Sequence, residues 1–107
     1  MKRLIVRWAR PASLDLIEII EFIRQDRATA ARKMGRAILL EASRLSRHPH
    51  AGKIVPELLK QGISEYRQVL VPPYRVVYAV RKAFVEIVAV TDSRRDLQAV
   101  LFQRLIR

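Results

Sequence analysis

The fold is decided by a stretch that reads Glu65-Tyr66-Arg67-Gln68-Val69-Leu70-Val71, then Pro72-Pro73, then Tyr74-Arg75-Val76-Val77-Tyr78-Ala79-Val80. A third apolar run follows at 84–91, and the stretch ends in Arg94-Arg95. Each run is rich in the β-branched and aromatic residues that are enriched in strands. The connections are too short for a parallel crossover, which needs about a dozen residues. The sequence therefore predicts a meander of three antiparallel strands.

Side-chain alternation assigns the faces of these strands, because successive residues of a strand point to opposite sides. In the middle strand we expect one face to be core, and it carries Tyr74, Val76, Tyr78 and Val80. The opposite face carries Arg75, Val77, Ala79 and Arg81. The last strand is mostly apolar on both faces, with Phe84, Val88 and Val90 alternating with Val85, Ile87 and Ala89. This pattern is typical of a strand that is covered on both sides.

The residues before the meander predict one strand and two helices. Residues 3–8 read as a strand, placed at a sheet edge or beside the last strand. Pro11 suits the first turn of a helix at 12–25, whose polar side carries Asp15, Glu18, Glu21 and Gln25. Asp26 can cap a second helix at 28–47, and the tight connection makes the pair an antiparallel hairpin. Because two helices reverse the chain twice, we expect the first strand to run antiparallel to the strand at residue 65.

After the second helix, Pro49, Gly52 and Pro56 indicate a loop, and residues 96–107 have apolar positions at helical spacing. The predicted fold is thus α+β, with an antiparallel sheet of about four strands packed on an N-terminal helical hairpin. The element order is β-α-α-β-β-β with a short C-terminal helix. We expect one domain that covers residues 1–107, since this length buries a single modest core.

Composition gives a strong charge signal. The chain has 21 Lys and Arg against 10 Asp and Glu, a net charge of +11, and 16 of these cations are arginine because only five are lysine. A polyanion or a strongly acidic protein is the natural partner, although a solvated basic surface explains the charge about equally well. The absence of cysteine suits a reducing compartment, and no apolar run approaches the roughly 20 residues of a membrane span. We expect a soluble cytoplasmic protein that has no membrane partner and needs neither cofactor nor metal.

Several motifs in this order resemble the RelE/ParE superfamily, the toxins of bacterial type II toxin-antitoxin pairs. They are Pro49 to Gly52, Val55-Pro56-Glu57-Leu58, Glu65-Tyr66-Arg67, Tyr74-Arg75-Val76-Val77-Tyr78 and Val90 to Leu97, with a weaker match at Asp15-Leu16. The long helical hairpin, the Val-Pro-Glu-Leu run and the Arg-Arg-Asp-Leu ending look closer to the ParE branch. The resemblance spans nearly the whole chain and implies an acidic antitoxin whose C-terminal segment wraps the toxin.

Family resemblance leaves three functions open. The ParE-like reading is a toxin that binds DNA gyrase, and no enzyme activity is implied. The alternative is a RelE-like endonuclease that cuts mRNA on the ribosome, and a third reading is a non-toxic basic binding module. A nuclease needs an acid and a base besides its cations. Val69 replaces a basic residue of the RelE-type pattern, and residues 97–102 lack the Tyr or His that RelE-type enzymes carry after the last strand.

The resemblance also implies site residues. The cations expected to contact the target are Arg67, Arg75, Arg94 and Arg95, and a nuclease would add His50 or Tyr74 as its acid or base. Arg75 has an equally weighted structural alternative, in which it pairs with Asp92 or Glu65 and holds the sheet. An exposed apolar patch ringed by arginine would bind the antitoxin, and we expect it to contain Val85, Ile87, Ala89 and Arg81. The other possibility is that the C-terminal helix covers this face within the monomer.

Overall fold

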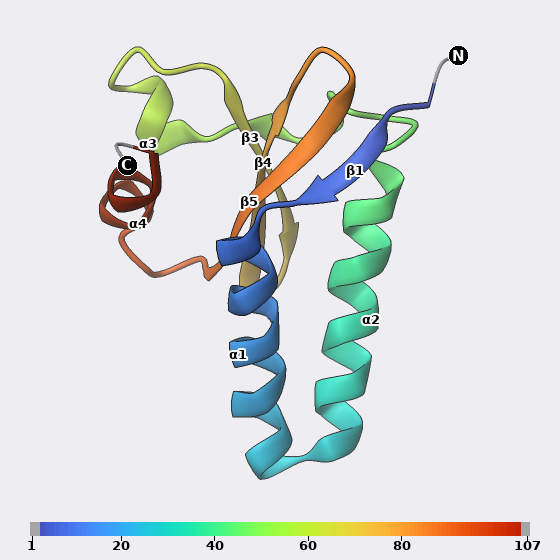
Figure 1. Ribbon diagram of the computed structural model, residues 1–107. Helices are drawn as coiled ribbons and strands as arrows, with labels where there is room; N and C mark the ends of the chain where they lie inside the picture. The colour runs from blue at the N-terminus through green and yellow to red at the C-terminus, as the bar shows by residue number, and fades with distance from the viewer. Residues whose placement is uncertain (1–2, 106–107) are drawn as a thin grey trace.

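A five-stranded sheet lies between a long helical hairpin on one face and two short helices on the other (Figure 1). The computed structural model describes residues 3–105. The strands are β1 (Ile5–Trp8), β2 (Lys53–Ile54), β3 (Tyr66–Val71), β4 (Tyr74–Val80) and β5 (Phe84–Asp92). The helices are α1 (Arg10–Asp26), α2 (Ala28–Arg44), α3 (Pro56–Leu59) and α4 (Leu97–Leu105). The α+β class, the hairpin and the C-terminal helix are as predicted.

The meander β3-β4-β5 is antiparallel, as the short connections require. β1 occupies the sheet edge beside β5, where the sequence could place it, but it runs parallel to β5, so the expectation of a wholly antiparallel sheet was wrong. The reason is the fifth strand, β2, which the sequence did not predict. Since β2 is antiparallel to β3, it adds one reversal between α2 and β3, and β1 and β3 end up pointing the same way.

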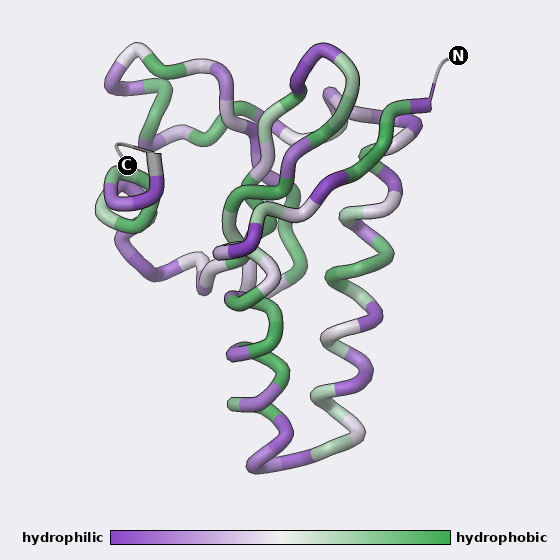
Figure 2. Tube along the Cα trace, viewed as in Figure 1, coloured by the Kyte–Doolittle hydropathy of each residue, from purple (hydrophilic) through white to green (hydrophobic). Residues whose placement is uncertain are grey.

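The helical hairpin is held by close packing. A single residue, Arg27, links α1 to α2 in an extended conformation and is also the N-cap of α2, so the expected cap by Asp26 was wrong. A Cβ at Gly35 would lie 3.0 Å from Ile20 Cδ1, which shows how closely the two helices approach. The far ends of both helices extend beyond the sheet (Figure 1), and their connection is hydrophilic (Figure 2).

Two apolar layers form the core, one on each face of the sheet. The first packs the hairpin on the sheet and includes Leu16, Ile38, Leu45, Val76 and Tyr78. The second lies under α3 and α4 and includes Leu58, Val77, Ala79, Leu97 and Leu101. β4 therefore alternates between the layers as predicted, and α3 and α4 supply the cover that the doubly apolar last strand requires.

A β-bulge in β5 changes which of its residues share a face. Tyr78 pairs with Ile87 and Val77 with Ala89, so Val88 is the extra residue that has no partner in β4. A bulge shifts the alternation of the strand by one position. Val85, Ile87 and Val90 consequently face the hairpin, whereas Val88 and Ala89 face α4. The expectation that Val85, Ile87 and Ala89 share one face was wrong for this reason.

α4 is fastened to α1 through a partly buried ion pair. Arg104 Nη2 lies 2.7 Å from Asp15 Oδ1, and its Nη1 donates to Asp15 Oδ2 at 2.8 Å and to the carbonyl of Val88 at 3.0 Å. Asp15 Oδ2 also accepts the backbone N–H of Val90 at 2.9 Å. Asp15 was expected on the solvated side of α1, but it is 7% exposed and joins α1, β5 and α4.

In the part of the chain from residue 3 to residue 105, no helix combines the length and apolar character needed to cross a membrane.

Candidate functional site

Arg75 is the most buried of the arginines expected to contact a target. It lies on β4, and its side chain is 6% exposed. Its guanidinium donates to both carboxylate oxygens of Glu57, at 3.0 and 2.5 Å, and to Gln68 Oε1 at 3.0 Å. This hydrogen-bonded ion pair lowers the pKa of Glu57 below its ordinary value of 4.5. Arg75 thereby ties α3 to the centre of the sheet.

The partner of Arg75 differs from both of the carboxylates considered in the sequence. Asp92 pairs with Arg94, and Glu65 pairs with Arg81. Glu57 belongs to the Val-Pro-Glu-Leu motif, which the sequence analysis quoted without giving that glutamate a role. Glu57 could have been predicted as the partner of Arg75, because it is a carboxylate within a family motif and lies next to a turn that can bring it back onto the sheet.

Arg67 fixes the loop at residues 48–52. Its Nη1 donates to the carbonyl of Gly52 at 2.7 Å and, at 3.5 Å, to the carbonyl of His50. The backbone N–H of Gly52 donates to the hydroxyl of Tyr78 at 2.9 Å. Burial raises the pKa of Tyr78, which keeps this hydroxyl protonated. The imidazole of His50 belongs to an exposed residue, so Arg67 and His50 meet through the backbone and not through their side chains.

Gly52 is required at its position by the space around it. A Cβ there would clash with the carbonyl oxygen of Gln68 and would lie 2.7 Å from the hydroxyl of Tyr78. Because the first of these atoms is backbone, it cannot move aside as the end of a flexible side chain could. The loop at 48–52 therefore packs tightly against β3 and β4, and this close packing requires glycine at position 52.

Tyr74 and Arg95 come together in a groove between α1 and the end of β5. We call it the α1–β5 groove; its volume is about 230 Å³, and it is lined by Asp15, Glu18, Ile19, Phe22, Tyr74, Val90, Thr91, Asp92 and Arg95. Arg95 is exposed and forms no ion pair with a carboxylate of residues 3–105. Phe22 is 72% exposed at the same groove. Phe22 was not among the predicted site residues, although a phenylalanine directly after Glu21, on the polar side of α1, was a visible signal.

Asp92, one of the charged groups at this groove, is poorly suited to proton transfer. Arg94 donates two side-chain hydrogen bonds and its backbone N–H to Asp92, and these lower the pKa of Asp92 to about 2. A general base works best when its pKa lies near the operating pH, so Asp92 is a weak base. Residues 3–105 contain no cluster of three or more His, Asp or Glu side chains that could hold a metal ion.

Of the four residues expected to bind an antitoxin, three are buried and one is partly exposed. Val85, Ile87 and Ala89 are 0% exposed, beneath the hairpin or α4, and the expectation that they form an exposed patch was wrong because both faces of β5 are covered. Arg81 is partly exposed and pairs with Glu86 at 2.8 Å and Glu65 at 3.3 Å. The exposed apolar side chains of the hairpin, which the sequence analysis did not single out, are Leu14, Ile17, Phe22, Leu39 and Leu40.

The six residues proposed for a nuclease do not converge. Arg67 binds the 48–52 loop, Arg75 is enclosed with Glu57, and Arg94 is paired with Asp92. Tyr74 and Arg95 both line the α1–β5 groove. The six predicted residues therefore do not form one site, and the α1–β5 groove combines the aromatic side chain of Tyr74 with the cationic side chain of Arg95.

Comparisons with known proteins agree with the fold. A family model described as "ParE toxin of type II toxin-antitoxin system, parDE" matches residues 6–97. A solved structure titled "Chromosomal ParDE TA system from P. aeruginosa" is similar with a TM-score of 0.69 and 17% sequence identity, over 84% of this chain and 96% of that chain. At this identity the likeness supports the fold alone. Comparison with curated proteins gave no match.

Proposed function

The chain belongs to the family of ParE toxins of type II toxin-antitoxin systems, and we propose that it blocks growth by binding DNA gyrase until a cognate antitoxin neutralises it. The family membership supports a toxin. The choice of gyrase over the ribosome rests on the ParE-like branch of the family and on the chemistry of the arginines. A gyrase target would place the protein in the bacterial cytoplasm.

The burial of Arg75 and its pairing with Glu57 are the observation that favours gyrase over the ribosome as the target. Cleavage of RNA needs cations that are free to stabilise the charge developing on the phosphate. The charge of Arg75 is already balanced by Glu57, and its side chain is 6% exposed. Contact with an RNA phosphate would require breaking this pair and uncovering the sheet. The geometry therefore favours a structural role for Arg75 and a toxin that acts by binding.

For the surface that contacts gyrase we propose the α1–β5 groove with Arg95, Tyr74 and Phe22. Arginine and aromatic residues supply most of the binding energy at protein interfaces. Arg95 is free of described carboxylates, and Phe22 exposes most of its ring beside it. Arg94 adjoins the groove, but its pairing with Asp92 makes it the weaker contributor.

For the antitoxin we propose an acidic, amphipathic segment that folds on binding. The exposed apolar side chains of α1 and α2 fit the apolar face of such a segment, and the excess of arginine fits its charge. Ile17 is 59% exposed and Leu40 is 54% exposed, so this contact would not require opening the core.

The test is inducible expression without the antitoxin, with a DNA-damage reporter and mapping of mRNA ends in the same cells. We expect damage signalling with intact mRNA. Cleavage at codon positions with a silent reporter would instead identify a ribosome-dependent endonuclease. Full growth with neither response would leave the non-toxic binding module. The matched variants are Arg95→Ala in the groove and Arg36→Ala on the exposed side of α2, and only the first should weaken toxicity.

A further inference from the structure

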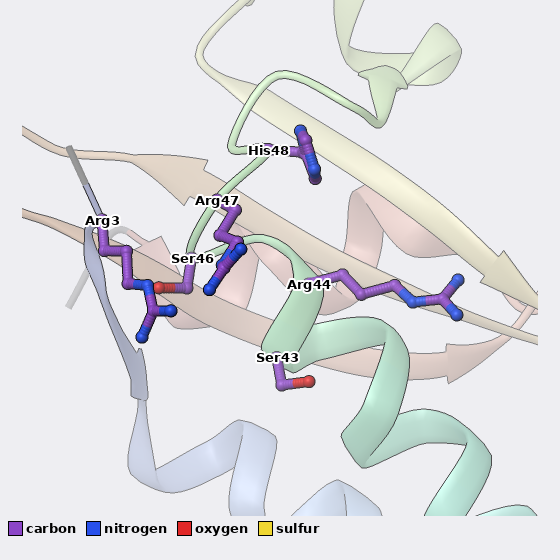
Figure 3. Close-up of a pocket in the computed structure, with 6 residues that line it drawn as sticks. All are labelled: Arg3, Ser43, Arg44, Ser46, Arg47 and His48. Carbon is purple, nitrogen blue, oxygen red and sulfur yellow. The ribbon is translucent and has the colours of Figure 1, made fainter. Parts of the chain in front are cut away.

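A second hollow, separate from the α1–β5 groove, lies where the C-terminal end of α2 meets the start of β1. Its volume is about 650 Å³, it is open to solvent, and we call it the basic hollow. Its lining consists of Arg3, Ser43, Arg44, Ser46, Arg47 and His48 (Figure 3). No carboxylate and no apolar side chain belongs to this lining, and none of its residues lines the α1–β5 groove.

A pair of hydrogen bonds between Leu4 and Ser46 builds the basic hollow. The backbone N–H of Leu4 donates to the carbonyl of Ser46 at 2.9 Å, and the Ser46 hydroxyl donates to the carbonyl of Leu4 at 2.6 Å. These bonds join residues 42 positions apart in the chain. Arg3 and Arg47 directly flank the joined residues, and Figure 3 shows both guanidinium groups beside Ser46, one from each segment. The fold thus joins the two segments that carry Arg3 and Arg47.

Of the three arginines in the basic hollow, one is paired with a carboxylate and two are not within residues 3–105. Arg44 pairs with Glu41 at 3.0 Å, and its side chain extends away from the other two arginines in Figure 3. Neither Arg3 nor Arg47 forms an ion pair with a described carboxylate. Cations at the end of α2 offset the negative end of its dipole, which accounts for Arg47. The dipole does not account for Arg3, which belongs to the segment before β1.

The chemistry of this lining selects its ligand. Two arginines on joined segments can turn their guanidinium groups toward one anion, which would accept forked hydrogen bonds from both. Ser43 and Ser46 already donate their hydroxyl protons to carbonyls, so the arginines supply the donors. Protein interfaces bury apolar side chains at their centre, whereas nucleic-acid interfaces are polar and strongly positive. Because every lining residue is polar or positively charged, this lining resembles the second kind more than the first.

We propose that the basic hollow binds the phosphate backbone of a nucleic acid, with Arg3 and Arg47 as the phosphate contacts. Both DNA and RNA carry the same phosphodiester, and the lining offers no group that would choose between them. This inference goes beyond inhibition of gyrase and does not depend on it, because the two surfaces have no residue in common.

The test measures binding of the purified chain to a short fluorescent DNA duplex and to a single-stranded RNA, by anisotropy over a range of salt concentrations. The hollow variant is Arg3→Gln with Arg47→Gln. The matched control, Arg32→Gln with Arg36→Gln, removes the same charge from the exposed side of α2. The side chains of Arg3 and Arg47 make no hydrogen bond within residues 3–105, so both double variants should unfold at the wild-type temperature.

We expect the hollow variant to bind about tenfold more weakly at low salt and to lower the slope of log K against log salt by about 2, one for each lost phosphate contact. The control should change both quantities much less. Loss in both nucleic-acid arms supports backbone recognition in general, and loss in one arm identifies the ligand. Equal losses in the hollow variant and the control would overturn the proposal, because binding would then follow total charge. It would also be overturned if the wild type bound neither probe.

Discussion

Replacing Asp15 by alanine should loosen α4 and lower the stability of the whole chain. Asp15 accepts three hydrogen bonds, two from Arg104 and one from the backbone N–H of Val90. Alanine keeps α1 helical, because its helix propensity is the highest of all residues. The loss therefore reports on the link between α1, β5 and α4 and not on the helix itself.

The size of the effect follows from what each partner loses. The N–H of Val90 becomes a buried donor without an acceptor, which costs about 1–3 kcal/mol. The side chain of Arg104 is 22% exposed and can turn toward water. We therefore set its contribution near the surface-pair value of about 1 kcal/mol. Together these give a loss of about 2–4 kcal/mol, or a decrease of about 8–16 °C in Tm for a chain of this size.

The assay is urea unfolding, combined with hydrogen exchange in residues 97–105. Asp15→Ala should lower the midpoint and speed exchange in α4 more than in β4. Asp15→Asn keeps an oxygen for Val90 and should lose less. The control is Glu18→Ala, an exposed carboxylate one turn further along α1, which should have little effect. A loss from Asp15→Ala within about 0.5 kcal/mol of the control, the range expected at ordinary surface positions, would refute this account of α4.

Three further outcomes are expected from the site. Tyr78→Phe removes the acceptor of the Gly52 N–H and should cost about 1–2 kcal/mol in urea unfolding, whereas an unchanged midpoint would show that the 48–52 loop does not depend on this hydroxyl. Because Arg75 lowers the folded-state pKa of Glu57, their pair stabilises the fold above pH 4.5 and loses that effect as the pH falls below it; Glu57→Gln should flatten this dependence between about pH 6 and pH 3. If Glu57→Gln keeps the wild-type dependence of stability on pH, the Arg75–Glu57 pair is not the source of that dependence. Arg95→Ala should reduce toxicity at unchanged Tm, and full toxicity in cells would remove Arg95 from the proposed target surface.

Local sequence patterns predicted most helices and strands of this fold. The features that they did not predict depend on contacts between residues that are distant in the sequence, or on positions that have no distinctive pattern. The meander was predictable because alternation and breakers lie within the strands themselves. The direction of β1 was not, since it depends on the two residues of β2, too few for a periodic signal. The bulge at Val88 was also hidden, because β5 is apolar on both faces and a shift of one position leaves its pattern unchanged.

The candidate site was harder to predict because its partners are distant in sequence. Asp15 lies three residues before Glu18 on a helix, and its pattern indicated a solvated carboxylate. Its partner Arg104 is 89 positions away, on a helix whose docking no local pattern determines. Arg75 raised the same difficulty, since its partner Glu57 belongs to a four-residue helix whose position depends on the fold. Arg95 was predicted by resemblance and Tyr74 as a possible acid or base next to Arg75, and the structure adds that they line one groove.

Net charge alone is a poor guide to where this protein binds, because the fold uses many of its cations internally. Arg75 and Arg104 are paired with carboxylates, and Arg67 is bonded to backbone carbonyls, so none of the three is available to a ligand without structural loss. A surface that binds an anion is better recognised by several cationic side chains that lie near one another and have no carboxylate partner. The hydrogen bonds between Leu4 and Ser46 produce such an arrangement, because they join the two chain segments that carry Arg3 and Arg47. Bringing these like charges near each other does not stabilise the fold electrostatically. Arg3 and Arg47 form no ion pair with a described carboxylate, so the basic hollow leaves their charges open to an anionic ligand, as we propose.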